Sequence, residues 1–133
     1  MNFFTRQRDH HLRILNWLLV VLWMLLIFSL SSRSSFPVDF TPTIYKVISS
    51  LFHVFLYAVL TWLLIRSLIA SGLKPKRALF YSFLIVIIYG SSDEWHQSFI
   101  PGREMALDDW LIDAVSSLAI IYYYSWRQRL RLK

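Results

Sequence analysis

The sequence predicts an all-α integral membrane protein, a four-helix bundle with both termini in the cytoplasm and a polar pocket toward the outer leaflet. Three observations predict this class. Hydrophobic residues make up 56% of the 133 residues, more than the roughly 45–50% of a soluble domain. Four apolar runs are separated by short segments rich in serine, proline and glycine. Basic residues gather on alternate sides of these runs, as they do in multi-pass proteins of a cell membrane.

The expected helices follow the apolar runs. The first helix (12–30) and the second (47–66) match the ~20 helical residues that a bilayer core of about 30 Å requires. The third (78–97) and the fourth (109–126) reach this length only by including acidic residues near one end. We find no repeat and no room for a second domain, so residues 1–133 are expected to form one membrane domain. A signal peptide is the alternative reading of the first run, which is long for one.

Lysine and arginine predict the orientation of these helices. Most of them lie in the N-terminus, the second connection and the C-terminal tail, and the positive-inside rule assigns these segments to the cytoplasm. The tail is therefore interpreted as a topology anchor that also contacts anionic lipid, rather than as a nucleic-acid-binding segment. The basic residues on this side are Arg6, Arg8, Arg13, Arg66, Lys74, Lys76, Arg77, Arg127, Arg129, Arg131 and Lys133.

Polar residues recur on one face of each of the last three helices. In the second helix they stand three or four residues apart, which places them on one helical face. An ionisable side chain that faces lipid costs about 2.5–3.5 kcal/mol, so these residues should face one another in a pocket. They are Lys46, Ser50, His53, Tyr57 and Thr61 in the second helix, Gly90, Glu94 and Gln97 in the third, and Asp109, Asp113, Ser116 and Ser117 in the fourth.

Not every polar residue is expected to belong to the pocket. The convergent set is His53, Glu94, Gln97, Arg103, Asp109 and Asp113. Asp93, Glu104 and Asp108 are expected to be solvated loop or helix-cap charges, with Asp108 capping the fourth helix. Hydrogen bonding between helices is the role expected of Ser31, Ser32, Ser116, Ser117 and Thr61. The alternative is that the whole set only braces the helices, with Arg103 paired to Asp109 or Glu94 and His53 bonded to a serine.

The polar residues of the last two helices resemble the signature of the VanZ-like family, small membrane proteins named for a teicoplanin-resistance accessory protein. The residues that match in order and spacing are Glu94, Gln97, Arg103, Asp109 and Asp113. The segments FSLSSRSSFP and HVFLY also resemble the family's first and second helices. The chain departs from the pattern at Ser50, Ala106 and Ser116, where relatives often have lysine, serine and glycine; Lys46 lies one turn before the missing lysine.

The resemblance implies a multi-pass protein of the bacterial cell envelope, linked in some members to glycopeptide-antibiotic tolerance, and it supplies no established reaction. From the residues, we expect an anionic lipid, a lipid-linked precursor or a glycopeptide-type ligand. Arg103 offers a planar fork for phosphate or carboxylate. Gln97, Lys46 and Tyr57 complete the expected ligand-binding set.

Catalysis is a hypothesis for the remaining residues of the pocket. His53 is suited to moving a proton, and Glu94 to acting as a general base that Gln97 orients. Asp109 and Asp113 complete this catalytic set. We expect no cofactor and no metal, because no tight ligand motif is present and Arg103 already supplies positive charge. Mg²⁺ or Ca²⁺ stays open because the cluster is rich in oxygen.

Two other functions compete with a ligand site. One is a non-enzymatic accessory protein that binds a drug, a peptidoglycan stem or a partner membrane protein. The other is a small transporter, which would need an oligomer to enclose a path. The polar stripes end near Thr61 and Ser117, so transport is the least favoured. The chain has no cysteine, which excludes disulfides, thiolate nucleophiles and cysteine-bound metals.

Overall fold

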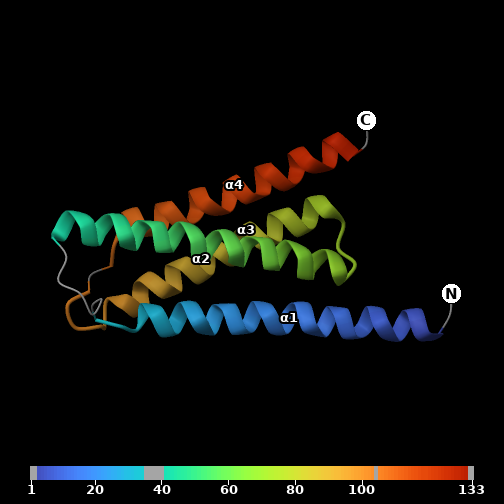
Figure 1. The fold of residues 1–133 in the computed structure, drawn as a ribbon, viewed down its shortest axis with the longest axis horizontal. Helices are drawn as coiled ribbons and strands as arrows, with labels where there is room; N and C mark the ends of the chain where they lie inside the picture. Colours follow the sequence, from blue (N-terminus) through green and yellow to red (C-terminus); the bar gives the residue numbers. More distant parts are fainter. Residues whose placement is uncertain (1–2, 35–40, 104, 132–133) are drawn as a thin grey trace.

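The computed structural model contains four α-helices, α1 (Phe3–Ser31), α2 (Pro42–Ala70), α3 (Pro75–Gln97) and α4 (Leu107–Arg131) (Figure 1). It describes the backbone of residues 3–34, 41–103 and 105–131, and the side chains of this set except those of residues 3–9, 42 and 131. The all-α, four-helix prediction is confirmed. Several predicted charges lie outside the described side chains, namely Arg6, Arg8, Glu104, Arg131 and Lys133.

Capping residues, rather than the width of a bilayer, set the ends of α2. The helix begins before the predicted residue 47 because Thr41 accepts a hydrogen bond from the Ile44 amide (3.4 Å) and proline occupies the first turn. It ends just before Gly72, whose positive φ of 93° lets its amide donate to the Ile69 carbonyl (2.9 Å). The length of the apolar run therefore predicted the middle of this helix but not its capped ends.

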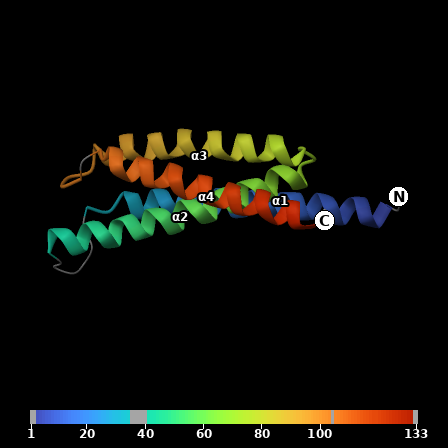
Figure 2. The ribbon, with the colours of Figure 1, turned by 90° about the horizontal axis from the view of Figure 1, so that it is seen from above.

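Successive helices run in opposite directions, so the N- and C-termini lie at the same end of the bundle as the α2–α3 connection (Figures 1 and 2). We call this the termini end. The α1–α2 and α3–α4 connections lie together at the opposite end, here called the loop end. Helix α2 packs against the other three helices, and α3 also contacts α4 and, at fewer positions, α1.

An apolar core fills the middle of the bundle. Its buried members come from α1, α2 and α3, and they include Val20, Ile27, Leu60 and Val86. Hydrogen bonds from large side chains tie α1 to its neighbours. The Trp23 indole donates to the Leu56 carbonyl (2.8 Å), and the Tyr89 hydroxyl donates to the Met24 carbonyl (2.6 Å).

Two helices are long and apolar enough to cross a membrane, over His10–Ser31 and Thr43–Ala70. In α3 and α4, charged residues interrupt or border the apolar segment, as Arg77 and Asp93 do in α3. All four helices nevertheless expose large hydrophobic side chains. Examples are Leu22 (61% exposed), Leu51 (63%), Ile88 (62%) and Val115 (63%). Contiguous apolar surface of this kind is unusual on a soluble monomer, and it suits contact with lipid.

Candidate functional site

The polar residues of α2, α3 and α4 meet near the loop end, around His53. Its Nδ1 atom lies 3.0 Å from Asp113 Oδ1, a hydrogen-bonding distance, and its Nε2 atom lies 3.8 Å from Asp109 Oδ2. His53 and Asp113 are 8% and 1% exposed. A carboxylate on Nδ1 holds the imidazole in one orientation, which leaves Nε2 as the nitrogen directed toward Asp109. The bond to a serine considered for His53 is absent from the described residues.

Glu94 lies close to His53 and Asp113 and is only 2% exposed. Its Oε2 atom accepts a hydrogen bond from the backbone amide of Ala106 (2.7 Å), at the start of α4. One ligand atom each from His53, Glu94 and Asp113 lies within 4.8 Å of the others. The structure therefore brings together three of the four residues to which a catalytic role was assigned, and Asp109 borders them through His53.

Asp93 is the residue that the sequence analysis placed wrongly. It was expected to be a solvated charge, yet it is 4% exposed and lies inside the bundle. Its Oδ2 atom accepts hydrogen bonds from the Tyr57 hydroxyl (3.4 Å) and from Gln97 Nε2 (3.1 Å). Gln97 was expected to orient Glu94 and orients Asp93 instead. The physical reason is that α3 packs against three helices, so it buries a wider arc than one polar stripe.

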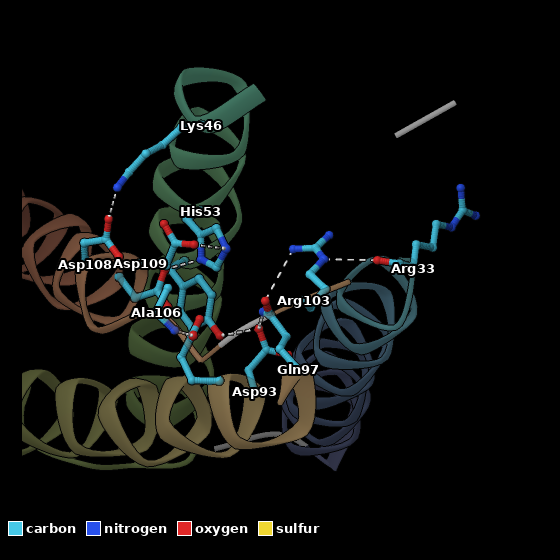
Figure 3. Close-up of polar contacts among 12 residues, drawn as sticks. Arg33, Lys46, His53, Asp93, Gln97, Arg103, Ala106, Asp108 and Asp109 are labelled. Atoms are coloured by element: carbon cyan, nitrogen blue, oxygen red, sulfur yellow. Dashed lines mark hydrogen bonds and ion pairs between the residues drawn. The ribbon is translucent and has the colours of Figure 1, made fainter. Parts of the chain in front are cut away.

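Arg103 also differs from the expected bracing pattern. Its Nη1 atom donates to Gln97 Oε1 (3.3 Å) and its Nε atom donates to the Arg33 carbonyl (3.1 Å), as Figure 3 shows. No ion pair joins Arg103 to a carboxylate among the described residues. The proposed pairs with Asp109 and Glu94 are thus not formed there. The Arg33 side chain points away from Arg103, so only its carbonyl takes part (Figure 3).

Lys46 lies at the rim of the site rather than inside it. It forms an ion pair with Asp108, and both side chains are exposed (Figure 3). The hydrogen bond from Lys46 lowers the pKa of Asp108 below its usual value. Asp108 was expected to precede and cap α4, but it lies within the first turn of that helix. Its carboxylate there is favourably placed against the positive helix end.

Two cavities adjoin the polar cluster. The inner one, of about 110 Å³, is lined by apolar residues of α1 and α2 and by His53, Tyr57, Asp93, Gln97 and Arg103. The outer one, of about 440 Å³, is lined by Lys46, Asp108, Asp109, Gln97 and Arg103 among others. Arg103 and Gln97 line both. Glu94 and Asp113 line neither cavity and lie behind His53 and Asp109.

Two of the five hydroxyl groups expected to join helices bond within their own helix. Thr61 donates to the Tyr57 carbonyl (2.7 Å) and Ser116 to the Ile112 carbonyl (2.7 Å). Ser31 and Ser117 have buried hydroxyls with no hydrogen-bond partner among the described residues. Ser32 alone of the five joins two helices, because its hydroxyl lies 3.0 Å from His96 Nε2.

Besides Asp93, the side-chain pattern did not indicate the Ala106 amide, and it placed Gly90 on the pocket face without a role. The Ala106 amide holds Glu94, and no side-chain pattern signals a backbone donor. Gly90 lies against Asp113, Trp110 and Tyr57, and a Cβ atom there would lie 3.4 Å from Asp113 Oδ2. A glycine inside a polar helical face was the available signal for this close approach.

Comparison of the chain with protein-family models, curated proteins and solved structures found no match. The resemblance to the VanZ-like family therefore rests on the residues quoted above, and it stays a prediction. What the geometry adds is independent of that resemblance. A buried cluster of one histidine and several carboxylates adjoins two cavities, and Arg103 lines both of them.

Proposed function

We propose that the chain is a multi-pass membrane protein of the bacterial cell envelope, similar to the VanZ-like proteins, that binds an anionic ligand at the loop end. The ligand class is an anionic lipid, a lipid-linked envelope precursor or a glycopeptide-type molecule. In this proposal the loop end faces the outer leaflet and both termini are cytoplasmic. A reporter fused after Lys133 should then read as cytoplasmic, and an extracytoplasmic signal would contradict the orientation.

One observation carries the proposal. Arg103 lines both cavities and forms no ion pair with a described carboxylate. Its guanidinium is held by two neutral oxygens, so its full positive charge faces the cavities. A planar guanidinium with spare N–H groups is suited to a phosphate or carboxylate.

The shape of the inner cavity supports a ligand with an apolar part. Apolar side chains line it on the side of α1 and α2, including Ile27, Leu30, Phe52 and Leu56. Polar side chains, including Arg103, line the rest of the same cavity. A molecule with an anionic head and a hydrocarbon chain would satisfy both surfaces, because each part would meet groups of matching polarity.

Bracing of the helices is the competing function, and two features weigh against it. The expected charge pairs of Arg103 are absent from the described residues, and three buried carboxylate oxygens have no hydrogen-bond partner there. Bracing residues are expected to satisfy one another, since interhelical bonds stabilise a bundle only when both partners are paired. A transport path is not supported, because the buried hydroxyls toward the termini end bond to their own helices.

The test compares Arg103→Lys with Arg77→Lys in the full-length protein, reconstituted in nanodiscs. Binding of phosphatidylglycerol and of a polyprenyl phosphate is measured by native mass spectrometry, with phosphatidylcholine as the uncharged reference. Lysine keeps the positive charge but lacks the paired N–H groups of a guanidinium. Arg103→Lys should therefore weaken anionic-lipid binding about tenfold, which is a loss of about 1.4 kcal/mol of binding free energy. Arg77→Lys should not, because Arg77 lies in the first turn of α3, at the termini end, and lines neither cavity.

Glu94→Gln separates function from folding. In a crowded, desolvated cluster, neutralising one carboxylate removes repulsion, so thermal stability measured in metal-free buffer should hold or rise. Teicoplanin susceptibility of cells that express the variant should change even though protein level does not. Wild-type behaviour of a stably expressed Glu94→Gln protein, or equal binding by both arginine variants, would overturn the proposal.

A further inference from the structure

Three carboxylates are buried side by side near the loop end with little positive charge to balance them. Asp93, Glu94 and Asp113 are 4%, 2% and 1% exposed. His53 is the only described basic side chain that pairs with one of them. Lys46 is bound to Asp108 at the exposed rim, and Arg103 to Gln97 and a backbone carbonyl. Burying an ionised carboxylate without a counter-charge is very unfavourable, so this cluster needs protons or a cation.

The hydrogen bonding of the cluster is also incomplete. Each of the three carboxylates has one buried oxygen with no hydrogen-bond partner, namely Asp93 Oδ1, Glu94 Oε1 and Asp113 Oδ2. Such atoms are rare in folded proteins, and an unplaced ion or water is a standard reason for them. Asp113 Oδ2 lies over Gly90, where a glycine keeps the helix surface clear of side-chain atoms.

The donor atoms are close enough to share an ion. One ligand atom from each of His53, Glu94 and Asp113 lies within 4.8 Å of the others. Bonds of about 2.0–2.2 Å in a tetrahedral site place the ligand atoms about 3.4 Å apart. The three side chains must therefore approach one another by up to about 1.4 Å when an ion binds. We propose that His53, Glu94 and Asp113 form a binding site for one divalent metal ion, Zn²⁺ or Mn²⁺.

The ligand chemistry selects these ions. One imidazole and two carboxylates suit Zn²⁺, whose three-ligand sites leave a fourth position open, and Mn²⁺, which favours oxygen. Binding through Nδ1 would replace the hydrogen bond to Asp113. Asp109 then lies beside the other ring nitrogen, at 3.8 Å, as the outer carboxylate that often orients a metal-bound histidine. Asp109 also lines the outer cavity, which provides a polar route to the site.

This proposal reverses the sequence-based expectation of no metal. That expectation rested partly on Arg103 supplying the positive charge, and in the structure Arg103 contacts no described carboxylate. The metal site does not depend on the anionic ligand proposed above. Its test measures the ion alone, so either proposal can fail without the other.

The experiment uses full-length protein in detergent, stripped with a chelator and then dialysed against Zn²⁺, Mn²⁺ or Mg²⁺. Elemental analysis gives the ions bound per chain, and a melting curve gives the stabilisation. We expect about one Zn²⁺ or Mn²⁺ per chain, a higher melting temperature with the ion, and weaker binding of Mg²⁺. Glu94→Gln and Asp113→Asn, which preserve shape, should each weaken binding at least tenfold.

Asp108→Asn is the matched control, because this acid lies in the same helix but is exposed and paired with Lys46. It should bind the ion as the wild type does. No stoichiometric ion in the wild type, or equal losses in Asp108→Asn and Asp113→Asn, would overturn the site. If the cluster variants do not fold, the wild type still decides the question. Added Co²⁺ should then give the visible absorption of a site with a nitrogen ligand, and its absence would refute the proposal.

Discussion

The two ends of the bundle both bury polar side chains, but they satisfy them in different ways. Toward the termini end the buried polar groups are neutral, Asn16 and two serines, and the two serine hydroxyls bond within their own helices. Ser67 donates to the Leu63 carbonyl (2.8 Å) and Ser82 to the Leu79 carbonyl (2.9 Å). Toward the loop end the buried groups are ionisable, and their contacts run between helices, as from His53 to Asp113.

The difference follows from which side chains can donate a hydrogen bond and which can only accept one. A serine hydroxyl donates, and the carbonyls of its own helix can accept, so it needs no neighbour. An ionised carboxylate only accepts, and the backbone amides in the middle of its helix are already used. It must therefore find a donor or a cation on another element. Buried hydroxyls are compatible with a passive bundle, whereas the buried carboxylates require a site that holds protons, ions or ligand groups.

The largest expected effect on stability comes from removing the His53 imidazole near the loop end. His53→Ala leaves Asp113 buried without its partner, and breaking a buried pair from one side costs about 3–5 kcal/mol. We expect the free energy of unfolding to fall by that amount, measured by denaturant titration in detergent with a chelator present. His53→Ala combined with Asp113→Ala should recover part of the loss. A fall below about 1 kcal/mol would show that Asp113 does not depend on His53.

A smaller effect on stability is expected at Gly90, where α3 lies against side chains of α2 and α4. A Cβ at Gly90 meets Asp113 Oδ2 at 3.4 Å and atoms of Trp110 and Tyr57 at 3.6 Å, which is ordinary contact. Gly90→Ala should therefore be neutral or slightly stabilising. Gly90→Leu should cost about 1–3 kcal/mol by overpacking. Melting temperatures of both variants test this, and equal values would contradict the close approach of α3 to α2 and α4.

The smallest effects compare two serines. Ser32 lies against His96 and joins α1 to α3, so Ser32→Ala should cost about 0.6 kcal/mol, the average for such bonds in membrane bundles. Ser67→Ala should change stability less, because that hydroxyl bonds only its own helix. Parallel unfolding curves measure the difference. A larger loss from Ser67→Ala would contradict the distinction between the two ends.

Periodicity predicted much of the candidate site. Spacings of three and four placed His53, Tyr57 and Thr61 on one face of the second helix, and all three are buried. The same reasoning on the third and fourth helices selected Glu94 and Asp113, which the structure places beside His53. It did not find Asp93, because a helix with three neighbours buries more than one face.

The number of helices, their order and the faces that turn inward follow from local apolar length and from a helical period of 3.6 residues. Which atoms meet depends on how the helices pack against one another. The rotation and offset of α3 against α2 and α4 join Gln97 to Asp93 rather than to Glu94. The chain path after α3 carries Arg103 to neutral oxygens and brings the Ala106 amide to Glu94. Such pairings depend on positions that residues distant in the chain set together, and no local pattern encodes them.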